Sequence, residues 1–154
     1  MDARIRPVER RDAFSLAALQ IQHDREQGRA PRPGFITEYA DAFLAEIDDY
    51  RGWIAEETDG NPVGCLLALR VCKLPTLMAE GRPEWWYVQQ VFVTADRRRE
   101  GLGRRLLHAV QEAATAERVR FVRLNSSDAG RPLFDATGFG DPTGRLREWV
   151  PPKA

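Results

Sequence analysis

The hydrophobic positions of this chain follow two periods, one typical of helices and one typical of strands. Apolar residues at three- and four-residue spacing predict helices over residues 12–27, 36–47 and 102–117, and a short fourth helix over 129–137 ends at Gly138. Shorter runs rich in apolar, β-branched and aromatic residues predict strands over 5–8, 53–57, 63–71, 85–93, 119–124 and 146–150. The predicted order is β-α-α-β-β-β-α-β-α-β.

Turn-forming residues separate these elements. The Asp59-Gly60 pair suits a hairpin between the second and third strands, and prolines and glycine make loops of 29–34 and 74–83. We find no internal repeat and no low-complexity linker. The pattern therefore predicts an α/β fold, with a mixed sheet covered by helices and one domain over residues 1–154.

Composition and charge narrow the choice of partners. The 23 basic and 23 acidic side chains cancel, so no long-range field favours nucleic acid or an anionic membrane surface. Cys65 and Cys72 lack the spacing and histidine partners of a zinc site. No run approaches the ~20 apolar residues of a membrane span, and residues 1–30 hold no signal-like segment. We expect no metal, and a cytoplasmic location.

The most informative segment is the turn between the fourth strand and the third long helix, Val91–Arg104. A helix N-terminus presents free N–H groups and partial positive charge, and glycine lets an anion approach the backbone. The arginine run 97–99 could be only a solvated surface, but its place before Gly101-Leu102-Gly103 favours a pyrophosphate cradle over residues 99–104.

Two other phosphate-binding loops do not fit this turn. The dinucleotide fingerprint requires a small residue where this chain has Leu106. A nucleotide-triphosphate loop requires Gly-Lys followed by Ser or Thr, and the chain has no such triplet.

The segment instead resembles the cofactor signature of the GNAT superfamily of acyl-CoA-dependent N-acetyltransferases: Arg or Gln, two residues, Gly, one residue, then Gly or Ala. Arg98, Gly101 and Gly103 match it. Val93 upstream, Asn125 after the following strand and the Gly138-Phe139 pair match further family positions, so the resemblance covers most of the chain.

The resemblance implies a mostly antiparallel central sheet that splays beside the signature strand, with helices on both faces. Acetyl-CoA would be the acyl donor and coenzyme A a product. Its pantetheine would pair with Val91, Phe92 and Val93, an arrangement that resembles strand addition at an open sheet edge. Further cofactor contacts would come from Arg98, Arg99, Glu100, Gly101, Leu102, Gly103, Arg104, Asn125 and Phe134, the last near the sulfur. Asn125 could also simply bond a turn.

The implied reaction is direct acetyl transfer to a primary amine of a small molecule or a protein, with the backbone N–H of Val91 as oxyanion donor. A homodimer is possible in such folds. Trp85, Trp86 and Tyr87 alternate across the strand, so at least one should pack in the core and another is a candidate to line the acceptor site.

Two positions depart from the family pattern. Phe134 stands where the family's general acid is a tyrosine, and Gln89 and Gln90 stand where many relatives carry a basic carboxylate. Neither phenylalanine nor an amide exchanges the required proton. Other candidate proton-handling or donor groups are His23, Glu84, Ser126, Ser127 and Asp128.

These departures leave a second interpretation open, in which the chain is a catalytically silent acyl-CoA-binding regulatory module. A third, a nucleic-acid binder that uses the arginine run, is disfavoured by the zero net charge.

Overall fold

The computed structural model describes residues 2–142 and 144–153. Its elements, in chain order, are β1 Arg4–Pro7, α1 Ala13–Glu26, α2 Phe35–Ala45, β2 Tyr50–Glu56, β3 Pro62–Cys72, β4 Glu84–Val93, α3 Leu102–Ala116, β5 Val122–Leu124 and α4 Arg131–Ala136. Short 3-10 turns occur at Arg10–Asp12, Ile47–Asp49 and Ala95–Arg97. The four predicted helices and the first five predicted strands are confirmed, with bounds that move by up to three residues.

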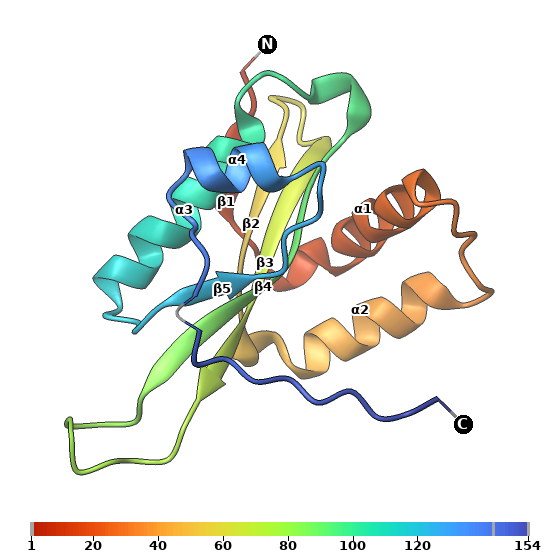
Figure 1. The fold of residues 1–154 in the computed structure, drawn as a ribbon. Helices are drawn as coiled ribbons and strands as arrows, with labels where there is room; N and C mark the ends of the chain where they lie inside the picture. The colour runs from red at the N-terminus through yellow and green to blue at the C-terminus, as the bar shows by residue number, and fades with distance from the viewer. Residues whose placement is uncertain (1, 143, 154) are drawn as a thin grey trace.

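The strands form one sheet in the order β1-β2-β3-β4-β5. Each neighbouring pair is antiparallel except β4 and β5, which are parallel. Helices α1 and α2 lie on one side of the sheet, and α3 and α4 lie on the other (Figure 1). The predicted mixed, mostly antiparallel sheet is therefore confirmed.

Each face of the sheet carries its own core, because successive strand residues point to opposite sides. Leu66 and Trp86 pack toward α3 with Leu106, Leu107 and Val110, all of them fully buried. The adjacent Leu67 packs on the other face with residues of α1 and α2, where Phe92 of β4 joins it. Strand β4 thus contributes side chains to both cores.

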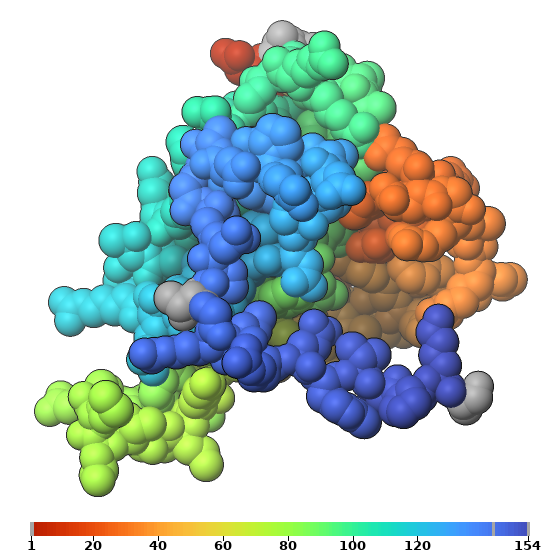
Figure 2. Space-filling model, in the orientation of Figure 1, coloured from red at the N-terminus to blue at the C-terminus, as the bar shows by residue number. Residues whose placement is uncertain are grey.

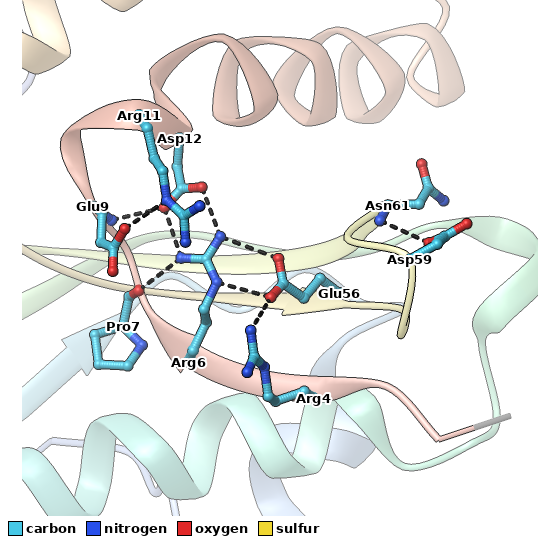
Figure 3. A network of polar contacts seen from close by, with 9 residues as sticks. All are labelled: Arg4, Arg6, Pro7, Glu9, Arg11, Asp12, Glu56, Asp59 and Asn61. Atoms are coloured by element: carbon cyan, nitrogen blue, oxygen red, sulfur yellow. Dashed lines mark hydrogen bonds and ion pairs between the residues drawn. The ribbon is translucent and has the colours of Figure 1, made fainter.

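A buried ion network joins β1, β2 and the turn before α1 (Figure 3). Arg6 donates to both carboxylate oxygens of Asp12, at 2.8 and 2.9 Å, and its Nε donates to Glu56 at 2.9 Å. Arg4 adds a second contact to Glu56 at 2.6 Å. Hydrogen bonds to Asp12 and Glu56 raise the pKa of the Arg6 guanidinium. The network fixes the start of α1 against the sheet.

The predicted final strand over 146–150 is wrong. Residues 144–153 contain no strand, and Leu146, Trp149 and Val150 are 60%, 78% and 68% exposed. Apolar residues at 146, 149 and 150 do not alternate, and the following Pro151 and Pro152 lack the N–H that a sheet ladder needs. This segment instead runs in extended form across the lower front of the molecule (Figure 2).

The loop over 74–83 is confirmed as a loop and projects from the body as a separate lobe (Figure 2). An isolated β-bridge joins Thr76 and Ala79 within it, and at its base the Lys73 N–H donates to the Pro83 carbonyl at 2.8 Å. None of the helices within 2–142 and 144–153 is long and apolar enough to cross a membrane.

Candidate functional site

Strands β4 and β5 separate soon after they meet. Their parallel pairing covers only Trp86–Val88 of β4, opposite Val122–Leu124. Strand β4 continues to Val93, still paired with β3 on its other side. Among the described residues no strand pairs with 89–93 on the β5 side, so about 16 Å of β4 presents an open edge. An open edge offers backbone N–H and C=O groups to an extended ligand.

A β-bulge lies where this open edge begins. Leu67 of β3 pairs with Gln90 and Ala68 pairs with Val88, so Gln89 is the extra residue of β4. A bulge bends the strand and changes the direction of the side chains beside it. Val91 and Val93, half-buried, pack toward α3, whereas Phe92 is buried on the α1 side.

The open edge leads directly into the turn before α3. Arg99 and Gly101 adopt the left-handed conformation, with φ of 65° and 81°, and α3 begins at Leu102. The first helical bond of α3 runs from the Arg105 N–H to the Gly101 carbonyl. The N–H groups of Leu102, Gly103 and Arg104 therefore precede the helical ladder, as an anion site requires.

Gly103 allows α3 and α4 to approach closely. A Cβ at this position would lie 3.0 Å from Leu133 Cδ2. The glycine of the signature thus has a packing role in addition to the predicted anion-binding role.

The structure divides the predicted arginine run into different roles. Arg97 pairs with Glu57 and, at 2.7 Å, with Glu100. Arg98 donates to the Val93 carbonyl at 2.9 Å and to Glu26 of α1 at 2.5 Å. Both side chains therefore hold the turn against the body of the protein, and the Glu100 carboxylate is committed to Arg97.

Two other arginines of the turn remain available for an anion. The side chains of Arg99 and Arg104 are exposed and form no hydrogen bond or ion pair with the described part of the chain. They flank the first turn of α3, where the helix dipole also favours negative charge. Leu102, in contrast, is 3% exposed and packs in the core with Ala55 and Val63, so only its backbone can face a ligand.

Comparison with known proteins decides the family. Residues 16–139 match the acetyltransferase (GNAT) family. The chain belongs to the GNAT acetyltransferases. The resemblance drawn from the signature residues is confirmed, and the mixed sheet with helices on both faces is the GNAT fold.

Solved GNAT-fold structures cover nearly the whole chain. A predicted acetyltransferase from Clostridium acetobutylicum, solved with acetyl-CoA, superposes with a TM-score of 0.77 at 19% identity, over 95% of each chain. An aminoglycoside acetyltransferase from an uncultured soil sample gives 0.70 at 19% identity, over 99% of this chain and 100% of that one. A ribosomal-protein-alanine N-acetyltransferase from Brucella melitensis gives 0.69 at 22% identity, over 97% and 99%.

Asn125 and Phe134, the two predicted cofactor contacts beyond α3, lie at different elements of this GNAT chain. Asn125 follows β5 directly, and its Nδ2 donates to the hydroxyl of Tyr87 on β4 at 3.1 Å. Phe134 on α4 is buried, with its ring 6.2 Å from that of Phe139 in an edge-on arrangement. The contact between Asn125 and Tyr87 was not predicted, because nothing in the sequence places residues 38 positions apart at the same point.

Glu84 and Asp128 are poorly placed for proton transfer at the splay. Glu84 accepts hydrogen bonds from Arg70 and Cys72 and lies about 17 Å along β4 from the bulge. Burial favours its neutral form, but these hydrogen bonds outweigh burial and lower the pKa of the carboxyl. Asp128 is fully exposed, and its one ion pair within the described part of the chain is with Arg131, at 3.3 Å.

His23 contacts the signature strand β4, and Ser126 and Ser127 lie in the turn before α4. The His23 ring stacks on Phe92 with centroids 5.2 Å apart, and its Nδ1 is buried with no hydrogen-bond partner among the described residues. The Ser127 hydroxyl accepts the Gly130 N–H at 3.1 Å, and Ser126 donates to the Ser127 carbonyl at 3.0 Å. Both hydroxyls therefore already have partners in the turn before α4.

Proposed function

We propose that this chain is an acetyl-CoA-dependent N-acetyltransferase that moves an acetyl group directly to a primary amine. The observation that carries the proposal is the open edge of β4, which runs from the bulge at Gln89 straight to the N-terminus of α3. One extended ligand with amides at one end and phosphates at the other would match both parts.

The residues present fit such a ligand. Thr94 donates its N–H to Val63 of β3, and strand residues alternate, so Val91 and Val93 present their backbone groups to the open edge while Phe92 faces β3. The backbone groups of Val91 and Val93 would bind the pantetheine amides along this edge. The N–H groups of the first turn of α3 would bind the pyrophosphate, and the exposed guanidinium groups of Arg99 and Arg104 would neutralise its charge.

Acetyl-CoA supplies an activated acyl thioester when it is bound. The protein must then orient the amine and stabilise the negative charge that develops on the acyl oxygen. The backbone N–H of Val91, just beyond the bulge, is our candidate donor to that oxygen. Because a thiolate with a thiol pKa of about 8.5 is a fair leaving group, Phe134 in place of a tyrosine should slow the reaction without preventing it.

The acceptor is a primary amine of a small molecule or of a protein. One structural neighbour is named for aminoglycosides and another for the alanine of a ribosomal protein, and these acceptors share only the amine. At identities of 19% and 22%, neither substrate transfers to this chain.

A thiol-release assay with acetyl-CoA and a panel of amines tests the proposal. The panel should include a polyamine, an aminoglycoside, free amino acids and alanine-terminated peptides. We expect amine-dependent release of coenzyme A with at least one class. Acetyl-CoA binding without release across the panel would support the silent binding module, and absence of binding would overturn the cofactor site itself.

A further inference from the structure

We infer that Glu26, the last residue of α1, is a positioning residue for the cofactor. Through Arg98 it holds the Val93 carbonyl at the end of the open edge of β4, where strand-like binding of the ligand gives way to phosphate binding. The inference rests on the proposed function, because it concerns the same cofactor site. It gives a role in that site to a residue of α1, which lies outside the signature segment.

The peptide group between Val93 and Thr94 is bonded at both ends. Its N–H, on Thr94, donates to the Val63 carbonyl of β3 at 2.9 Å. The C=O and N–H of a trans peptide group point in opposite directions, so the Val93 carbonyl faces the open edge. There it accepts a hydrogen bond from the Arg98 Nε at 2.9 Å. This bond uses one of the two lone pairs of the oxygen and fixes the direction of the last peptide group of the edge.

The same guanidinium group connects this peptide to α1. Arg98 donates to Glu26 at 2.5 Å, and its Cζ lies 5.5 Å from the centre of the Phe92 ring. His23 lies three residues before Glu26, on the same side of α1, and stacks on the Phe92 ring with centroids 5.2 Å apart. The end of α1 and the end of β4 therefore share a joint of four side chains, to which Glu26 contributes the carboxylate.

Glu26 keeps the Arg98 guanidinium beside β4. The Arg98 side chain is 46% exposed, and a long side chain of this kind loses rotamer freedom when it is fixed. A pyrophosphate at the N-terminus of α3 would also attract the guanidinium away from the strand. The Glu26 carboxylate gives it a charged partner on α1, so that the Nε stays on the Val93 carbonyl. Neutralisation of the phosphates is then left to Arg99 and Arg104, whose exposed side chains form no ion pair with the described part of the chain.

The two parts of the cofactor should respond differently when Glu26 is neutralised. Loss of a negative charge near the phosphates should by itself favour acetyl-CoA. Release of the Val93 carbonyl should weaken binding along the strand edge, whether or not the ligand carries phosphate. S-acetylpantetheine lacks the pyrophosphate and therefore isolates the second effect.

Calorimetric titration of Glu26→Gln with S-acetylpantetheine tests the inference. Because exposed ion pairs contribute modestly, we expect the dissociation constant to rise about twofold to fivefold. The value for acetyl-CoA should rise less, since the two effects oppose each other. Glu38→Gln is the matched control, because it breaks an ion pair with Arg32 that is also exposed but joins α2 to the loop before it. This control should leave both affinities unchanged.

Arg98→Gln gives a second readout, one that a merely structural role of Glu26 would not move. Glutamine is the alternative that the family signature allows at this position. Its amide can still donate to a carbonyl, but it has no charge to pair with Glu26. In the Arg98→Gln background, Glu26→Gln should therefore cause no further loss of S-acetylpantetheine affinity. A general weakening of the fold would instead produce the same loss in both backgrounds.

The outcomes separate this inference from the proposed function. If the wild-type protein binds neither acetyl-CoA nor S-acetylpantetheine, the proposed function fails and the role of Glu26 fails with it. If acetyl-CoA binds, three results each overturn the role of Glu26 alone. These are no binding of S-acetylpantetheine to the wild type, equal affinity for it in wild type and Glu26→Gln, or the same loss in both backgrounds.

Discussion

Replacement of Arg99 by glutamine should weaken acetyl-CoA binding about fivefold to tenfold. The Arg99 side chain is exposed and has no partner in the described chain, so the substitution breaks no contact within the protein. Unit charges about 4 Å apart attract by about 1 kcal/mol in water and about 4 kcal/mol near a protein surface. Because Arg99 is exposed, we take a value of about 1 to 1.4 kcal/mol, which gives the stated change in the dissociation constant.

Calorimetric titration with acetyl-CoA and with S-acetylpantetheine measures this effect. The second ligand lacks the pyrophosphate, so Arg99→Gln should leave its affinity unchanged. Higher salt should reduce the difference between wild type and variant for acetyl-CoA, because exposed charges are screened. Arg98 is a poorer probe, since its replacement also breaks the contacts with Glu26 and Val93.

Arg118→Gln provides the matched control. Arg118 is an exposed arginine with a positive φ of 58°, like Arg99, but it follows the C-terminal end of α3. The 15 residues of α3 separate the two positions by about 22 Å. Equal affinity in wild type and Arg99→Gln, or an equal loss in Arg118→Gln, would refute the assignment of Arg99 to the phosphate.

Further predictions concern binding, turnover and stability. Gly103→Asp should weaken acetyl-CoA binding by about tenfold or more because it adds a negative charge to the first turn of α3, where the phosphates would bind. Gly103→Ala adds only a Cβ against Leu133 and should retain most affinity, and equal losses would assign the effect to packing. Phe134→Tyr should raise thiol release, by up to about 10²-fold, if a general acid is limiting; a large loss would show instead that Phe134 shapes the pocket. Arg6→Met should destabilise the protein by about 3 to 5 kcal/mol at neutral pH, because the buried Asp12 loses its guanidinium partner and Glu56 keeps only Arg4. Denaturant unfolding measures this, and a change below about 1 kcal/mol would contradict it.

The same ion network predicts how stability depends on pH. Hydrogen bonds from Arg6 and Arg4 lower the pKa of Glu56 below its unfolded value. Burial alone would raise the pKa of Asp12, but hydrogen bonds from Arg6 and from the backbone N–H of Glu9 lower it. A carboxyl with a lowered folded pKa contributes stability above its unfolded value of about 4, and this is lost as pH falls through the folded pKa. The stability difference between wild type and Arg6→Met should therefore shrink below about pH 4.

Local patterns in the sequence predicted most of the fold because the helices carry apolar residues at three- and four-residue spacing and the strands are short apolar runs bounded by turn residues. The register between strands is not a local property, since it depends on which residues of two strands meet. For this reason the sequence indicated Gln89 and Gln90 only as replacements for a carboxylate. The bulge that turns both toward the side of Tyr87 became visible only in the pairing of β3 with β4.

The sequence also could not indicate which arginines form ion pairs with residues far along the chain. Arg97, Arg98 and Arg99 look alike as a run, yet the structure commits the first two to carboxylates and leaves the third available. The final strand was wrongly predicted because apolar content alone does not guarantee a neighbouring strand to pair with. The open edge beside β4, in contrast, was anticipated from the family resemblance and not from periodicity.

Amide hydrogen exchange, measured with and without saturating acetyl-CoA, tests the central claim most directly. We predict slower exchange in peptides that cover the open edge of β4, residues 89–93, and the first turn of α3, residues 102–104. Peptides from β1 and β2, which lie away from the splay, should change little. Binding of acetyl-CoA without protection of these two segments, or protection elsewhere only, would contradict the account.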